Sequence, residues 1–479
     1  MNKGENAVAI ENMVRKVLEQ IAVGGNAPAT SGLSGFTGAN GENGIFTDME
    51  EAIAAAHKAQ QEYALYPMRR RDDFIEAIRD MVRRPDILRK LSEDAVAETG
   101  MGNVDDKMQK NKLVADKTPG TEDLITDAFS GDDGLSIVEL SPYGVIGAIT
   151  PTTNPTETVL CNSIGMLAAG NSVVFSPHPR AKNVSVFLVS ELNKALAALD
   201  APPNLIVTVA EPSIKSTEAM MNHKLVRMLV ATGGPEIVRT VMSTGKKAIG
   251  AGAGNPPVVV DETAIIEKAA MDIIAGCSFD NNLPCIAEKE VFAVEHIADY
   301  LIFNMKKFGA YQVTDENDLE RLKKLVLNDK GHAETSCIGK SAQYLLGKIG
   351  VKADPSVKAV IIDCGFDHPF VQEELMMPIL PIVRVSDVDS AIDLAVKAEH
   401  GFRHTAIMHS QNVSNLTNMA KRSQTTIFVK NGPSFAGIGV GGEGYTTFTI
   451  AGPTGEGLTS ARSFARRRRC VLVDGFNIR

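Results

Sequence analysis

Between residues 143 and 261, short apolar runs alternate with segments of helical periodicity, and only a few folds accommodate this alternation. The runs predicted as strands are YGVIGAIT, NSVVFSP, NLIVTVA, LVRMLVAT and PPVVVD. Segments such as VSVFLVSELNKALAAL and PEIVRTVMSTG lie between them and are predicted as helices. Strands that alternate with helices form a parallel sheet covered by helices on both faces. We therefore predict an α/β chain with a nucleotide-binding type of architecture, which many different functions share.

Charge and composition narrow the class of protein. The formal net charge of -9 at pH 7 argues against a general nucleic-acid binder, which needs clustered excess Lys and Arg. No run approaches the ~18 apolar residues of a membrane span, so a membrane protein is not expected. The six cysteines lack Cys-x-x-Cys spacing and we find no secretory signal. Reduced thiols in a cytoplasm are therefore expected, with neither a disulfide framework nor a zinc site.

The first 44 residues differ from the rest of the chain. Apolar residues recur with helical spacing between residues 8 and 21, which predicts a short amphipathic helix within 1–21. Residues 22–44 are rich in Gly, Ala, Ser and Asn and predict a flexible linker. Such a helix can dock back on its own domain or enter a groove of another protein, and periodicity alone does not decide between them.

Asn154 follows the end of the predicted strand YGVIGAIT and directly precedes a predicted helix. Ligands of doubly wound sheets bind outside the carboxyl ends of the strands, which places Asn154 in the predicted cleft. Its amide can donate a hydrogen bond to an oxyanion. The alternative is an Asn that only caps the helix or forms a turn.

Two Gly-rich segments receive different interpretations. Thr232-Gly233-Gly234 connects a predicted strand to a helix opened by Pro235. Backbone N–H groups at a helix start bind anions such as pyrophosphate, and Pro at the first helical position removes no needed donor. A plain strand-to-helix turn fits equally well, because the Gly-x-Gly-x-x-Gly fingerprint is absent. The segment GAGAGNPP at 250–257 runs into a strand and is interpreted as backbone in close approach to a neighbour.

Cys285 lies in a polar turn between the predicted helix IIEKAAMDIIAG and the predicted strand EVFAV, where a thiolate would be partly exposed. The other cysteines are interpreted as small buried hydrophobic residues: Cys161, Cys277, Cys337, Cys364 and Cys470. No neighbouring histidine indicates a papain-like pair. The thiolate must therefore react with an electrophile that needs little acid–base assistance, and an aldehyde is such an electrophile.

The order of these motifs, together with a Glu pair in FVQEELMMPILP, resembles the aldehyde dehydrogenase superfamily from about residue 45 onward. Alone, that Glu pair would be taken for a solvated surface feature. The resemblance implies a Rossmann-type cofactor domain, an α/β catalytic domain and a β oligomerisation arm. It implies Cys285 as nucleophile, with Asn154 and the Cys285 backbone N–H as the oxyanion hole. The resemblance implies that Glu374 lies near the nicotinamide ribose of the cofactor NAD and His178 near its adenosine ribose. The residues implied to contact NAD are Thr150, Pro151, Thr152, His178, Pro179, Thr232, Gly233, Gly234, Gly252 and Glu374.

The same resemblance divides the chain. The implied parts are an encapsulation-type helix at 1–21, a flexible linker at 22–44, a nicotinamide cofactor-binding domain at 45–255 with 130–142 contributing to the oligomerisation arm, a catalytic domain at 256–445, and a C-terminal segment with an oligomerisation strand at 446–479. The arm implies a homodimer or a homotetramer. The alternative role for Arg466 to Arg469 is contact with the phosphates of coenzyme A, since guanidinium groups bind phosphate bidentately.

One departure from the superfamily pattern indicates the reaction. Hydrolytic members carry a Glu in an ELGGK segment that activates water, whereas this chain has GAGAGNPPVVVD there. Without that base, an acyl group on Cys285 waits for a better nucleophile, and the thiol of coenzyme A fits. The strings FDNNLPCIAEK and SARSFARRRRCVLVD resemble the CoA-acylating aldehyde dehydrogenases of bacterial microcompartments. We therefore expect NAD-dependent oxidation of a short-chain aldehyde to an acyl-CoA, inside a microcompartment in the cytoplasm.

The strings NPTET and NLPCIAEK resemble the propionaldehyde enzymes of propanediol use more than the acetaldehyde enzymes of ethanolamine use. Propionaldehyde is therefore the expected substrate, with an acetaldehyde-preferring enzyme or a non-acylating aldehyde dehydrogenase as alternatives. Microcompartment cargo enzymes carry a terminal amphipathic helix on a flexible linker. The resemblance thus favours docking of residues 8–21 to shell or cargo proteins over docking to the chain's own domain.

Overall fold

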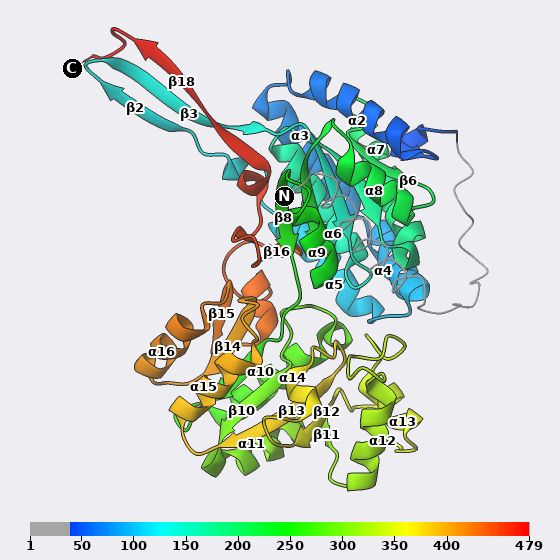
Figure 1. Cartoon of the computed structure of the whole chain (residues 1–479), viewed down its shortest axis with the longest axis vertical. Helices are drawn as coiled ribbons and strands as arrows, with labels where there is room; N and C mark the ends of the chain where they lie inside the picture. Colours follow the sequence, from blue (N-terminus) through cyan, green and yellow to red (C-terminus); the bar gives the residue numbers. More distant parts are fainter. Residues whose placement is uncertain (1–38, 479) are drawn as a thin grey trace, which may run out of the picture. The chain divides into compact units, whose positions relative to one another are not determined.

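The computed structural model describes residues 39–478, which form two compact units (Figure 1). Of the described residues, unit 1 contains 39–94, 110–251 and 445–478, and unit 2 contains 95–109 and 252–444. The predicted helix at 1–21 lies outside the described residues, as does the predicted linker up to residue 38. The last residues of that linker include a short 3-10 helix, Glu42–Gly44, that leads into the first strand.

Unit 1 is built on a six-stranded sheet in the order β1-β6-β5-β4-β7-β8, in which all paired strands are parallel. Its strands are β1 (Ile45–Phe46), β4 (Val145–Thr150), β5 (Ser172–Pro177), β6 (Ile206–Val209), β7 (Val226–Thr232) and β8 (Lys247–Ala251). The helices that begin in this unit are α2 (Met49–Tyr63), α3 (Met68–Arg83), α4 (Pro85–Thr99), α6 (Pro155–Ala168), α7 (Lys182–Ala197), α8 (Ile214–Asn222) and α9 (Pro235–Met242). The predicted parallel sheet is confirmed.

The core of unit 1 explains why these runs form strands. Every residue of β5 and β6 is buried, as expected for parallel strands with helices on both faces. The apolar stripe of α2 packs against this sheet, where Ile53 and Ala56 join a cluster that includes Val174 and Val207. Helix α6 is also buried along its whole length, so the segment that follows β4 enters the interior directly.

A three-stranded antiparallel sheet in the order β18-β3-β2 extends away from the rest of unit 1 (Figure 1). Its strands are β2 (Asp127–Gly131), β3 (Gly134–Pro142) and β18 (Ala465–Val473). β18 pairs with β3 of its own chain along its full length and is otherwise an edge strand. Arg466 to Arg469 are exposed, and so is Cys470; the prediction that Cys470 is buried is wrong, because β18 has a neighbour on one side only. A role in oligomerisation stays a prediction.

Unit 2 is built on a seven-stranded parallel sheet in the order β11-β12-β13-β10-β9-β14-β15. Its strands are β9 (Pro257–Val260), β10 (Glu290–Val294), β11 (Ala310–Gln312), β12 (Ala359–Asp363), β13 (Ile379–Val385), β14 (Thr405–His409) and β15 (Ile427–Lys430). The helices that begin in this unit are α5 (Val104–Lys117), α10 (Ile266–Ser278), α11 (Glu295–Lys307), α12 (Glu316–Val326), α13 (Ala342–Lys348), α14 (Pro369–Gln372), α15 (Val388–Ala398) and α16 (Val413–Ser423).

Residues 95–109 belong to unit 2, although the predicted boundary places them in the first domain. The reason is local: Asn103 N–H and Lys107 Nζ donate hydrogen bonds to the Asp280 carboxylate at 2.8 and 3.1 Å. The other predicted boundaries, near 255 and 445, lie within a few residues of the observed ones. The functions assigned to the two domains stay predictions. Within 39–478, no helix is both long and apolar enough to cross a membrane.

Candidate active site

The predicted cofactor segments of unit 1 meet at one edge of its sheet. β4 ends beside β5 through the pair Thr150↔Pro177, and β7 lies on the other side of β4 and ends at Thr232. Because these neighbouring strands are parallel, the segments that follow them lie at the same carboxyl edge. The residues brought together at this edge are Thr150, Pro151, Thr152, His178, Pro179, Thr232, Gly233 and Gly234.

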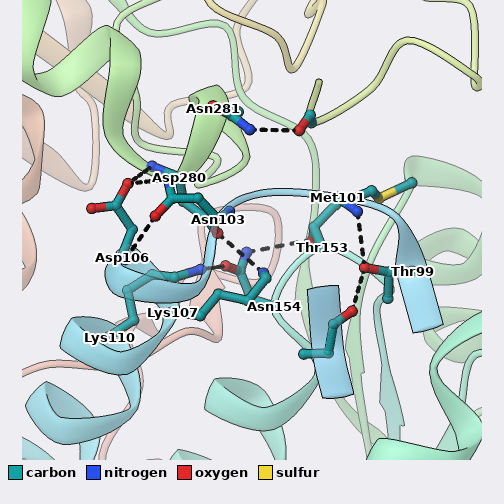
Figure 2. A network of polar contacts seen from close by, with 12 residues as sticks. Thr99, Met101, Asn103, Asp106, Lys107, Lys110, Thr153, Asn154, Asp280 and Asn281 are labelled. Atoms are coloured by element: carbon teal, nitrogen blue, oxygen red, sulfur yellow. Dashed lines mark hydrogen bonds and ion pairs between the residues drawn. The ribbon is translucent and has the colours of Figure 1, made fainter. Parts of the chain in front are cut away.

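Asn154 stands at the N-cap position of α6, but its side chain caps no backbone N–H of that helix. Its Oδ1 instead accepts a hydrogen bond of 2.5 Å from Lys110 Nζ (Figure 2). The backbone carbonyl of Asn154 accepts from the Thr158 hydroxyl at 2.7 Å, so the local turn is held without the amide. The part of the alternative in which the Asn154 side chain caps the helix is therefore wrong, and the role of Asn154 as an oxyanion donor stays a prediction.

Lys110 is a buried cation that the sequence did not reveal. It is fully buried and forms an ion pair of 2.8 Å with Glu157 of α6, which is equally buried. On α5 the buried face carries Lys107, Lys110, Asn111 and Val114 at helical spacing. Most of these residues are polar, so a search for hydrophobic periodicity passes over this helix. In the sequence this face is visible as polar residues that recur at helical spacing.

The Thr232-Gly233-Gly234 turn only partly matches an anion site. The Gly233 N–H donates to the carbonyl oxygen of Ala251 at 3.0 Å and is therefore already used by the sheet. Thr232 Oγ1 is hydrogen-bonded to Thr449 Oγ1 at 2.8 Å. At Gly234, the N-cap of α9, an added Cβ would meet no atom within 4 Å. The space for a phosphate group thus begins at Gly234 and not before it.

His178 is neutral and has a defined tautomer. Its Nδ1 accepts a hydrogen bond of 3.1 Å from the Arg180 N–H, which places the ring proton on Nε2. Burial, assisted by the charge of Arg180, lowers the pKa of His178 to about 4. At pH 7 the ring therefore offers an uncharged N–H donor, which suits a ribose hydroxyl better than a phosphate.

In unit 2 the candidate residues lie at the amino edge of the sheet. Gly254 precedes β9, Cys285 precedes β10, Glu374 precedes β13 and His404 precedes β14. The strands β13, β10, β9 and β14 are consecutive neighbours and all parallel, so the segments that lead into them lie side by side. Gly252 lies in the same segment as Gly254.

Cys285 lies in a tight turn closed by a hydrogen bond of 3.0 Å from the Ala287 N–H to the Pro284 carbonyl. The Cys285 side chain is half-buried, which confirms the partial exposure predicted for it. Among the other cysteines, Cys161, Cys277 and Cys337 are buried as predicted, whereas Cys364 is only half-buried at the end of β12. The assignment of the Cys285 N–H as an oxyanion donor stays a prediction.

The residues before Cys285 adopt an unusual backbone conformation. Asp280, Asn281 and Asn282 have φ angles of 48°, 54° and 66°, in the left-handed region that non-glycine residues rarely enter. Each such residue costs of order 1–3 kcal/mol unless its surroundings hold it. The Asp280 carboxylate, held by Asn103 and Lys107, supplies one restraint (Figure 2). We infer that this buried clamp fixes the loop that presents the nucleophile.

The buried cation Lys289 interacts with Cys285. Lys289 Nζ donates to Asn282 Oδ1 at 2.6 Å, and its charge interacts with Cys285 and Glu374. Burial raises the pKa of Glu374 to about 7, although Lys289 and the Gly254 N–H oppose the shift. Glu374 Oε1 is buried and accepts no hydrogen bond from the described residues. An acceptor of this kind fits a ribose hydroxyl, so the residue suits the predicted contact with NAD.

Gly254 separates the backbone of Cys285 from a histidine. A Cβ at Gly254 would lie 2.9 Å from His404 Cγ and 3.0 Å from the Cys285 carbonyl oxygen, and one at Gly250 would lie 2.5 Å from Val238 Cγ1. The close backbone approach predicted for 250–257 is thereby confirmed. Burial and the charge of Lys289 lower the pKa of His404 to about 4, and its Nε2 has no partner among the described residues. His404 is distant from Cys285 in sequence, which is why no neighbouring histidine was expected.

The described residues contain no cluster of His, Cys, Asp and Glu arranged to hold a metal ion.

A comparison with models of protein families matches residues 37–451 to the aldehyde dehydrogenase family. Among curated proteins, the chain is similar to a CoA-propanoylating propanal dehydrogenase from Citrobacter freundii. The two are 51% identical over 476 residues, which cover 99% of this chain and 100% of the relative.

Two solved structures extend the comparison. One is a propionaldehyde dehydrogenase from Rhodopseudomonas palustris with bound CoA and an acylated cysteine, with a TM-score of 0.90, 66% identity, and coverage of 91% of this chain and 100% of that chain. The other is a propionaldehyde dehydrogenase from the fucose utilisation bacterial microcompartment of Clostridium phytofermentans. Its TM-score is 0.89 with 52% identity, and it covers 91% of this chain and 100% of that chain.

Proposed function

The chain belongs to the aldehyde dehydrogenase family, and we propose that it oxidises a short-chain aldehyde, preferably propionaldehyde, to the acyl-CoA with transfer of a hydride to NAD. The observation that carries this proposal is the half-buried Cys285 thiol in a restrained turn, beside a 250–257 segment that has no acidic residue. A nucleophilic thiol without a water-activating carboxylate in that segment favours acyl transfer to a second thiol.

The first half-reaction begins at Cys285. Its sulfur attacks the aldehyde carbon, a C–S bond forms, and the carbonyl oxygen takes up the electron pair as an oxyanion. The positive charge of Lys289 interacts with Cys285, and a neighbouring cation is a common feature of reactive cysteines. We assign the stabilisation of the oxyanion to Asn154 Nδ2 and the Cys285 N–H.

The second half-reaction releases the acyl group. When bound, NAD accepts the hydride that leaves the former aldehyde carbon, which leaves a thioester on Cys285. Coenzyme A then forms a new sulfur–acyl bond while the Cys285 sulfur–acyl bond breaks. The thiol of coenzyme A must lose its proton for this attack. We assign its acceptance to His404, which lies beside Gly254 and whose Nε2 has no partner among the described residues.

The dependence of turnover on coenzyme A tests the function. With propionaldehyde and NAD but no CoA, we expect a burst of NADH of about one equivalent per active site and then almost no turnover, because the thioester persists. Added CoA should restore steady turnover with propanoyl-CoA as product. The measurement is NADH absorbance together with mass spectrometry of the product. Sustained turnover to free propionate without CoA would contradict the proposal and favour a hydrolytic aldehyde dehydrogenase.

We further propose that residues 8–21 direct the enzyme into a microcompartment. The amphipathic pattern of these residues supports this, as does the microcompartment source of one similar structure. Removal of residues 1–21 should leave kcat within about twofold of the full chain, because the predicted catalytic residues lie elsewhere, but should abolish recovery of the enzyme with purified shells.

A matched pair of substitutions separates the loss of the apolar stripe from other effects of removing residues 1–21. Val14→Asp places a charge on the apolar stripe, whereas Arg15→Asp changes the polar face of the same predicted helix. Only the first should release the enzyme from the shell. Loss of activity in the purified truncated enzyme, or normal encapsulation of it, would refute the assignment.

A further inference from the structure

We propose that Lys110 is a positioning residue of the reaction: it sets the orientation of the Asn154 amide, so that Nδ2 is presented to the oxyanion as a donor. This inference rests on the role of Asn154 in the proposed function. Lys110 lies on α5 and Asn154 directly precedes α6, and both belong to unit 1.

The chemistry of the two groups fixes which amide atom faces the lysine. A lysine ammonium has three donors and no acceptor. Its contact of 2.5 Å with Asn154 therefore requires the amide oxygen, Oδ1, to face Lys110 (Figure 2). Nδ2 must then face away from the lysine. An amide turned by 180° would bring two donors together at Lys110 and would present an acceptor oxygen where negative charge develops.

The remaining contacts of Asn154 leave Nδ2 with donor capacity. Its hydrogen bond to Thr153 Oγ1 measures 3.4 Å, longer than a usual N–H···O bond of about 2.7–3.2 Å. A charged donor on Oδ1 polarises the amide and strengthens the N–H groups at its other end. Lys110 thus both orients and strengthens the proposed oxyanion donor.

The burial of Lys110 argues for a role that a neutral residue would not supply. Its side chain and that of Glu157 have no exposed surface, and a buried ion pair often stabilises a fold no more than apolar residues of similar volume. A competing explanation is that the pair only ties α5 to α6. Under that explanation the effect of Lys110 comes from its contact with Glu157. Under ours, the effect of Lys110 on the reaction comes from its contact with Asn154.

The experiment follows the first NADH burst, in the absence of CoA, by stopped-flow absorbance. Lys110→Met, which has no donor, should slow the burst about tenfold to a hundredfold, up to the loss typical of an oxyanion donor. Lys110→Gln, which can offer a neutral donor, should recover part of the rate. Glu157→Gln removes the carboxylate charge but retains a side-chain oxygen that can accept from Lys110, so the Lys110–Asn154 contact should persist and the rate should change less than about threefold. Leu113→Ala, a buried apolar change on the same helix, should lower the melting temperature without slowing the burst.

A double-mutant comparison completes the test. If Lys110 acts through Asn154, adding Lys110→Met to Asn154→Ala should slow the burst by less than about twofold further. Equal slowing in both backgrounds, or equal losses in Lys110→Met and Glu157→Gln, would overturn the inference in favour of a structural ion pair. If Lys110→Met does not fold, Lys110→Gln and Glu157→Gln still decide between these explanations. An unimpaired Cys285→Ala variant would instead refute the proposed function itself.

Discussion

Replacement of Cys285 by alanine is expected to abolish aldehyde oxidation, with a fall in kcat of about a million-fold, the scale seen when a covalent nucleophile is removed. Alanine cannot form the C–S bond, so neither the thiohemiacetal nor the thioester can arise. The NADH burst in the absence of CoA should vanish together with steady turnover. Both are measured by NADH absorbance with propionaldehyde as substrate.

Cys364→Ala is the matched control for this substitution. Cys364 is also half-buried and also in unit 2, at the end of β12. Burial raises the pKa of Cys364 to about 12, so it is a thiol and not a thiolate at neutral pH. Its removal should leave the burst unchanged. A Cys285→Ala protein that keeps the burst, or an acyl group found by mass spectrometry on Cys364, would remove Cys285 from the reaction.

The sheets were largely predictable from the sequence, because their strands are short apolar runs bounded by turns. β5 and β6 are buried throughout, and such strands stand out as continuous Val- and Ile-rich segments. Helix α5 was not predictable by the same means. Its buried face carries Lys107 and Lys110, whose burial depends on Asp280 and Glu157, and hydrophobic periodicity cannot detect charges paired in this way.

The candidate site was predictable where a local motif carries the chemistry. The polar turn around Cys285 and the strand end before Asn154 each reveal a position from a few adjacent residues. His404 and Lys289 were not predictable in this way. His404 is brought to Gly254 by the order of strands in the sheet, and Lys289 lies in a charged run that is buried and not solvated. Their environments depend on tertiary packing, which a linear pattern does not contain.

Asn154→Ala is expected to lower kcat/KM for propionaldehyde by about a hundredfold to a thousandfold, or roughly 2.7–4 kcal/mol of transition-state stabilisation. The amide carries a donor fixed by Lys110, and alanine leaves the oxyanion without it. The aldehyde oxygen gains its full negative charge only after Cys285 attacks, so the loss should fall mainly on the burst rate and less on aldehyde binding. Stopped-flow measurement of the burst over a range of aldehyde concentrations separates the two.

Two further variants distinguish loss of the donor from loss of structure. Asn154→Asp keeps the shape and retains an acceptor for Lys110, but its carboxylate repels the oxyanion, so it should fold normally and be at least as slow as the alanine variant. Thr158→Val removes the hydroxyl that donates to the Asn154 carbonyl and should cost about 0.5–1.5 kcal/mol of stability with little effect on the burst. If Asn154→Ala kept a burst rate within about threefold of the wild type, the negative charge would have to be stabilised elsewhere. The Cys285 N–H would then be the remaining assigned donor, and the contact between Lys110 and Asn154 would be structural.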